Sequence, residues 1–172
     1  MKQFKELKKN LLERLGNDKL LHNYAFNCTS IEEILNIVKE NFNYFSSKKI
    51  IDTDFINEYK DIFNSEKIYA NVDVTDGFLL VDGSSKVSSL GYSRVTGYDN
   101  STVNAYGNST VIAWGNSRVT GYYNSTVNAY DNSIVSALGY SRVIGYDNSI
   151  LIAYGNSRVS AFGNSKLIDL RK

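Results

Sequence analysis

The chain is dominated by one eight-residue phrase, repeated eleven times without a break between Gly83 and Leu170. The third position is always serine, the fifth is valine or leucine, and the seventh is small in every octad except the last. A short fixed period is typical of stacked repeat architectures and limits the possible folds more than local propensity does. The octads are GSSKVSSL, GYSRVTGY, DNSTVNAY, GNSTVIAW, GNSRVTGY, YNSTVNAY, DNSIVSAL, GYSRVIGY, DNSILIAY, GNSRVSAF and GNSKLIDL.

Each octad is predicted to form one strand and one corner. Alternate residues of a strand share a face, so positions 3, 5 and 7 would point inward and positions 4 and 6 toward water. Positions 8, 1 and 2 would form the corner, because the Gly-Asn, Asp-Asn and Gly-Tyr pairs there tolerate a left-handed backbone. The sequence therefore predicts a mainly β fold, a parallel β-helix or β-solenoid.

The number of octads in a coil is predicted from a second period. Arg94, Arg118, Arg142 and Lys166 recur every 24 residues, and so do the glycines of position 7 at 97, 121 and 145. In a solenoid, sequence similarity is highest between residues one coil apart. We therefore expect a triangular solenoid with three octads, or about 24 residues, per coil. A coil of sixteen residues is the alternative, and it would break these columns.

The residues before the repeat have a helical pattern. Phe4 and the leucines that follow it are spaced three or four apart up to a stop at Gly16, and Ser30 with Glu33 forms a capping box. A third helix is expected near Thr53. We predict a helical head at 1–70 that covers the first coil, a degenerate first coil or junction at 71–82, and the solenoid at 83–172.

Charge and cysteine content restrict the environment and the partners. Residues 1–82 carry 11 basic and 14 acidic side chains (net −3), and residues 83–172 carry 8 and 4 (net +4). The basic solenoid favours a polyanionic or acidic protein partner. A single cysteine fits a reducing compartment, and we find neither a signal-peptide pattern nor an apolar run of about 20 residues. We expect a cytoplasmic protein without membrane contact.

Catalytic signatures are absent from the sequence. His22 lies in LLHNYAF and Cys28 lacks a partner motif, so both are interpreted as structural residues. Asp99, Asp131 and Asp147 fall at corners, where aspartate is common for backbone reasons. We predict that the protein is not an enzyme and uses no metal or cofactor.

Two outward surfaces are candidates for binding. The first is a basic and aromatic face, interpreted either as an anion-binding strip or as charge that keeps a flat β surface soluble. It comprises Arg94, Arg118, Arg142, Lys166, Tyr98, Tyr122 and Tyr146. The second is a set of outward positions that become apolar toward the C-terminal octads. We interpret it as a homodimer interface; the alternative is that these side chains point inward there. Its residues are Tyr130, Tyr154, Ile144, Ile150, Ile152 and Ile168.

The repeat GNSRVTGY-DNSTVNAY-GNSTVIAW and the preceding NVDVTDGFLLVD resemble a group of octapeptide-repeat proteins of bacteria and their phages. In that group a short helical head precedes the repeats. The resemblance covers about half of the chain, implies a β-solenoid, and supplies no catalytic residues. Its phage association implies a cytoplasmic inhibitor, similar to anti-CRISPR proteins, that acts on a host defence complex.

Three classes of function remain open from the sequence. The first is a non-enzymatic protein-binding module, an inhibitor of a bacterial nucleic-acid-handling effector, with at most weak direct binding to nucleic acid because four basic residues form a small footprint. The second is a carbohydrate-binding or ice-binding solenoid. The third is a structural spacer that carries the helical head.

Overall fold

The computed structural model describes residues 2–172 and contains two compact units. One unit ends at Ile68 and the other spans Tyr69–Lys172; we call them the helical unit and the solenoid unit. Within residues 2–172, no helix is both long enough and apolar enough to cross a membrane. That the helices cover the first coil of the solenoid stays a prediction.

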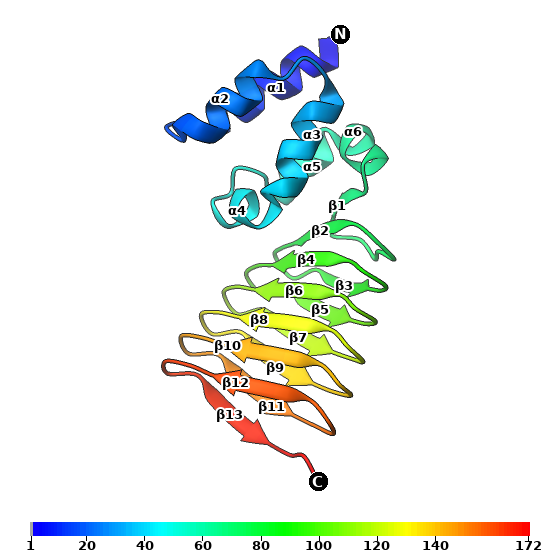
Figure 1. Ribbon diagram of the computed structural model, residues 1–172, viewed down its shortest axis with the longest axis vertical. Helices are drawn as coiled ribbons and strands as arrows, with labels where there is room; N and C mark the ends of the chain where they lie inside the picture. The colour runs from blue at the N-terminus through cyan, green and yellow to red at the C-terminus, as the bar shows by residue number, and fades with distance from the viewer. Residues whose placement is uncertain (1) are drawn as a thin grey trace. The chain divides into compact units, whose positions relative to one another are not determined.

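The helical unit consists of short helices packed around large apolar side chains (Figure 1). Its core includes Phe45, Phe55 and Phe63, none of them more than 1% exposed. The rings of Phe55 and Phe63 meet edge to face at 5.8 Å. The helices are α1 (Lys2–Leu15), α2 (Lys19–Asn27), α3 (Ile31–Glu40), α4 (Phe42–Ser47), α5 (Thr53–Glu58) and α6 (Lys60–Ser65).

Side-chain caps begin two of the longer helices. The Ser30 hydroxyl accepts a hydrogen bond from the Glu33 amide, which confirms the predicted cap of α3. The Glu33 carboxylate accepts from the Thr29 amide, and this bond lowers the pKa of Glu33. Asp18 caps α2, a helix that the sequence analysis did not predict, by accepting from the Leu21 amide.

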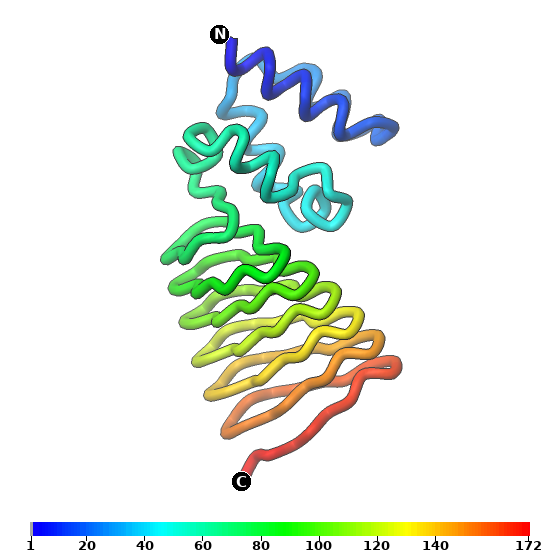
Figure 2. Tube along the Cα trace, turned by 180° about the vertical axis from the view of Figure 1, so that it is seen from behind, coloured from blue at the N-terminus to red at the C-terminus, as the bar shows by residue number. Residues whose placement is uncertain are grey.

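The solenoid unit is a stack of parallel strands in two sheets (Figures 1 and 2). Successive octads alternate between the sheets, so each strand pairs with strands sixteen residues away, as Val127 does with Val111 and Val143. Sheet A contains, in order, β1 (Ile68–Ala70), β2 (Phe78–Val81), β4 (Arg94–Gly97), β6 (Thr110–Ala113), β8 (Thr126–Ala129), β10 (Arg142–Gly145) and β12 (Arg158–Ala161). Sheet B contains β3 (Lys86–Ser89), β5 (Thr102–Ala105), β7 (Arg118–Gly121), β9 (Ile134–Ala137), β11 (Ile150–Ala153) and β13 (Lys166–Asp169).

The predicted parallel β-solenoid is therefore confirmed, whereas the triangular coil of about 24 residues is wrong. The corners explain the shorter coil. Position 1 has a positive φ in all eleven octads, including the non-glycine residues Asp99, Tyr123, Asp131 and Asp147. The amide of the serine at position 3 donates to the carbonyl of position 8 three residues earlier, as Ser101 does to Tyr98 at 3.1 Å. Such a tight turn reverses the chain and carries it from one sheet to the other, so two strands complete one coil.

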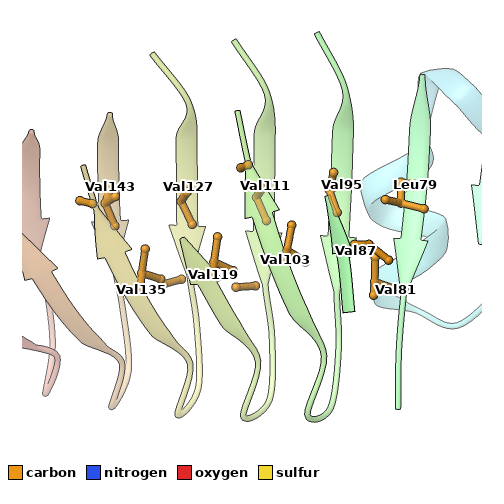
Figure 3. Close-up of a cluster of buried hydrophobic side chains, with 14 of the residues drawn as sticks. Leu79, Val81, Val87, Val95, Val103, Val111, Val119, Val127, Val135 and Val143 are labelled. Carbon is orange, nitrogen blue, oxygen red and sulfur yellow. The ribbon is translucent and has the colours of Figure 1, made fainter. Parts of the chain in front are cut away.

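The interior of the solenoid is the predicted Ser-Val-Ala face. Val103, Val111, Val127 and Val135 are completely buried, and Figure 3 shows valines of both sheets pointing into the space between them. The serines at position 3 are also buried from Ser93 to Ser157. Small side chains on both faces allow the two sheets to pack without gaps, because the same volumes meet in every coil.

The glycines of position 7 leave room for serine hydroxyls. A Cβ added at Gly97, Gly121 or Gly145 would lie 3.0, 2.7 or 2.6 Å from the Oγ of the serine four residues later. Where position 7 is alanine, a hydroxyl can turn to the corner instead, as Ser109 does when it donates to the Tyr106 carbonyl at 2.6 Å. Ser133 and Ser165 do the same after Ala129 and Ala161, whereas the hydroxyls that follow Gly97, Gly121 and Gly145 make no such bond.

Candidate functional site

Each sheet carries three basic side chains at outward position 4, but only sheet A places two of them side by side. Position 4 of each strand points outward and is occupied in sheet A by Arg94, Thr110, Thr126, Arg142 and Arg158. Arg142 and Arg158 are direct neighbours in the register of β10 and β12. Arg94 instead has Thr110 beside it, and its guanidinium lies 5.6 Å from the centre of the Phe78 ring.

The predicted ladder of four basic residues is wrong. A coil of sixteen residues places Arg94 and Arg142 on sheet A, and Arg118 and Lys166 on sheet B. Arg118 lies between Thr102 and Ile134, and Lys166 lies beside Ile150. A spacing of 24 residues equals one and a half coils, so each successive member of the set moves to the opposite sheet.

The tyrosines of the predicted basic face are separated in the same way. Tyr98 and Tyr146 follow strands of sheet A, whereas Tyr122 follows a strand of sheet B at the opposite edge. Tyr122 stacks on Tyr106 with the ring centres 4.6 Å apart. Tyr146 lies between Tyr130 at 5.1 Å and Phe162 at 5.6 Å.

These aromatic columns stabilise the stack. Trp114 continues the column of Tyr130, Tyr146 and Phe162, with its ring centre 4.2 Å from that of Tyr130. Both faces of the Tyr146 ring are covered by its neighbours, so this ring does not offer a free face to a nucleobase. Stacking of a nucleobase on Tyr146 is therefore not supported by its geometry.

The predicted dimer interface is also divided between the sheets. Ile150, Ile152 and Ile168 lie on the outward side of sheet B, where Ile152 pairs with Ile168 and Ile150 with Ile134. Ile144 lies on sheet A, and Tyr130 and Tyr154 lie at opposite edges. The structure therefore brings together three of the six predicted residues and adds Ile134 to them.

A hollow on sheet A joins residues that the sequence analysis did not connect. It has a volume of about 380 Å³ and lies at the start of β8, β10 and β12. Its walls are Asn124, Tyr140, Arg142, Asn156 and Arg158. Only Arg142 was a candidate before, since the other four become neighbours only when the coil has sixteen residues. The recurrence of asparagine or tyrosine at position 2, two residues before position 4, was the available signal.

Three of the four aspartates in the octads lie at corners, and the fourth, Asp169, is at position 7 of β13. Outward positions 4 and 6 of the octads, from Lys86 to Ile168, contain no aspartate or glutamate. Asp99, Asp131 and Asp147 occupy corners that follow sheet A. The Asp131 carboxylate accepts from the Gly115 amide at 2.9 Å, and that of Asp147 accepts from the Asp131 amide at 3.2 Å. These two carboxylates therefore connect successive coils.

The two reactive side chains of the helical unit have local contacts. The half-buried His22 stacks on Phe26 with ring centres 6.5 Å apart. Cys28 is 6% exposed, and burial raises the pKa of its thiol. Among residues 2–172, no group of three or more histidine, cysteine, aspartate or glutamate side chains is arranged to hold a metal ion.

No protein-family model, curated protein or solved structure matches the chain. The function is therefore inferred from the fold and from the hollow on sheet A.

Proposed function

We propose that this protein is a non-enzymatic binding protein that presents the outward surface of sheet A to an acidic partner protein. One observation carries the proposal: outward positions 4 and 6 of the octads hold basic side chains and no acidic ones, and on sheet A two of the arginines, Arg142 and Arg158, are direct neighbours. Such a surface attracts negative charge and accelerates association with an acidic partner. The parallel stack holds these side chains at fixed spacings, so little conformational entropy is lost in presenting them.

The spacing of the arginines favours a protein over a nucleic acid. Arg94 and Arg142 are separated by two coils whose position 4 is threonine. At about 4.8 Å per coil, this neutral gap spans about 14 Å. A nucleic acid carries a phosphate at every nucleotide and is bound most strongly by a continuous basic track. Direct binding to nucleic acid would therefore be weak.

The biological role we propose is inhibition of a bacterial nucleic-acid-handling defence effector, in the cytoplasm of the host. The resemblance of the octads to proteins of bacteria and phages supports this role. The sheet A surface would act by occupying an acidic region of the effector. Dimerisation through the isoleucines of sheet B would leave sheet A free, because the two surfaces lie on opposite sides of the solenoid.

The geometry of the position 4 columns does not favour ice binding. Ice-binding solenoids need long, flat rows of matching small polar side chains. In sheet A the position 4 column is interrupted by Arg94 and Arg142, and in sheet B it changes from Thr102 to Arg118 and then to Ile134. The Tyr146 ring is covered on both sides, so this tyrosine offers no open face to a sugar.

A matched pair of triple variants tests the proposal. The first variant, R94E/R142E/R158E, reverses the charge on sheet A, and the second, K86E/R118E/K166E, makes the same change at the same repeat position on sheet B. Proteins from a bacterial lysate would be captured on each variant and on the wild type, and circular dichroism would confirm folding.

We expect the sheet A variant to lose a partner that the wild type and the sheet B variant both capture. Equal loss in both variants would mean that only net charge matters. Full capture by the sheet A variant would refute the proposal.

A further inference from the structure

The hollow on sheet A has the composition of an anion-binding site. Two arginines on adjacent coils, Arg142 and Arg158, form one wall of the hollow. The other lining residues are Asn124, Asn156 and Tyr140. Each guanidinium offers five N–H donors, each amide two, and the phenol one. No carboxylate lines the hollow, so nothing in its walls neutralises the two positive charges.

The paired arginines have no counterion of their own within residues 2–172. None of the salt bridges or side-chain hydrogen bonds of that part of the chain involves Arg142 or Arg158. Both side chains are exposed at their strand positions. Their register holds two like charges on neighbouring strands, where they repel each other. An anion bound between them would remove this repulsion.

We propose that this hollow binds a phosphate monoester group. This inference rests on the proposed function, because it names the chemical group that the sheet A surface would recognise. A monoester carries close to two negative charges near neutral pH, which matches the two guanidinium groups, whereas a carboxylate carries only one. Arginine also presents its N–H donors in the planar fork that suits paired phosphate oxygens.

The volume and the aromatic wall define the size of the ligand. A hollow of about 380 Å³ is larger than a phosphate ion needs, and it falls in the range of small-molecule sites. Tyr140 is 68% exposed, so its ring is accessible to a group attached to the phosphate. The ligand is therefore a phosphorylated small molecule or a phosphorylated side chain, and both sources share the monoester.

The same repeat position elsewhere on the solenoid shows why the site is local. Arg118 on sheet B occupies position 4 as Arg142 does, but its neighbours in register are Thr102 and Ile134. It therefore has no second arginine with which to share a dianion. Arg118→Gln changes the charge of the protein by the same amount as Arg142→Gln and is a matched control.

The test is isothermal titration of the full chain with phenyl phosphate in phosphate-free buffer at about 0.15 M salt, where long-range attraction is screened. A second arm uses methyl phenyl phosphate, a diester with one charge. A third uses a phosphoserine peptide. The proteins are the wild type and the variants R142Q, R158Q and R118Q, each checked for folding by circular dichroism.

We expect the wild type to bind the monoester and R118Q to bind it equally well. R142Q and R158Q should each bind it at least about tenfold more weakly.

Tighter binding of the phosphoserine peptide than of phenyl phosphate would assign the ligand to a modified protein, and the reverse order to a small molecule. Equal binding of the diester would overturn the inference in favour of a nucleic acid backbone, and equal loss in R118Q would overturn the site. Absence of phenyl phosphate binding, with lysate capture still dependent on sheet A charge, would overturn this inference alone and leave the proposed function standing.

Discussion

The cores of the two units differ in the size and variety of their side chains. The helical unit packs large side chains of different kinds, such as Leu11, Ile34 and Phe55, and each has its own environment. The solenoid unit packs small and like side chains, and Val111, Val127 and Val143 have nearly the same neighbours. Because each coil contacts only the next, solenoid stability is close to a sum of repeated terms, whereas the helical unit depends on a few large contacts.

The largest effect is expected for Val127→Asp in the middle of the stack. Val127 is completely buried between β6 and β10, and an aspartate there would be charged without a partner. Hydrogen exchange should show loss of protection in the coils around β8, with protection in α1 and α3 retained. Asn128→Asp, at the adjacent outward position, is the control and should change little. Loss of protection throughout both units would contradict the separation of the two cores.

In the helical unit, Phe55→Ala should destabilise by about 3–5 kcal/mol, because a large buried ring leaves a cavity. Phe55 is 1% exposed and contacts the rings of Tyr59 and Phe63 at 5.2 and 5.8 Å. Hydrogen exchange should locate the loss in the helices and leave the coils protected. Leu20→Ala, at a side chain that is 64% exposed, is the matched change without a cavity. A smaller effect for Phe55 than for Leu20 would refute the assignment of this core.

A smaller effect is expected for Gly145→Ala inside the solenoid. The new Cβ would lie 2.6 Å from both the Ser149 Oγ and the Leu151 Cδ1, so the neighbours must move at a cost of about 1–3 kcal/mol. Gly97→Ala is milder, since its Cβ would meet the Ser101 Oγ at 3.0 Å and the Val103 Cγ2 at 3.5 Å. Urea unfolding of both variants measures the difference. Equal stability losses would show that the stack is uniform at this position, against the geometry.

The smallest effect concerns the exposed pair of Asp169 and Arg171. The Arg171 guanidinium donates to the Asp169 carboxylate and lowers its pKa from 3.8 to about 2. Because the folded pKa is the lower one, the stabilisation is present above pH 3.8 and is lost as the pH falls toward 2. Thermal unfolding between pH 5 and pH 2 should show a slightly shallower decline for Arg171→Gln than for the wild type. A steeper decline would contradict the sign of this linkage.

The interior of the solenoid was predictable because a buried position in a narrow stack accepts few residue types. Serine, valine and a small residue recur at positions 3, 5 and 7, and the structure buries Ser125, Val127 and Ala129 as expected. The cap at Ser30 was predictable for a similar reason, because helix ends need hydrogen-bond acceptors at defined spacings. By contrast, α2 was not predicted, since only Leu21 and Ala25 of its residues are buried and its apolar stripe is narrow.

The coil length and the hollow could not be read from the same pattern. Inward and corner positions repeat every eight residues, so they fit a coil of sixteen residues as well as one of 24. The 24-residue spacing came from the outward arginines 94, 118 and 142 and from the inward glycines 97, 121 and 145. Neither set has to match between coils, since glycine pairs with alanine in the neighbouring coil. The distinction depends on how far each corner turns the chain, and the hairpin-like geometry at position 1 becomes visible only in the structure.

The alternation of octads between two sheets has a consequence for how such a chain can change in length. Loss or gain of one octad ahead of Tyr140 would leave the inward serines and valines in place, since position 3 is serine and position 5 is valine or leucine in every octad. It would rotate everything downstream by half a turn about the stacking axis. Arg142 and Arg158 would stay adjacent but lie on the opposite side of the solenoid. The surface that contains them would then face the other way, while the interior would keep the same serines and valines.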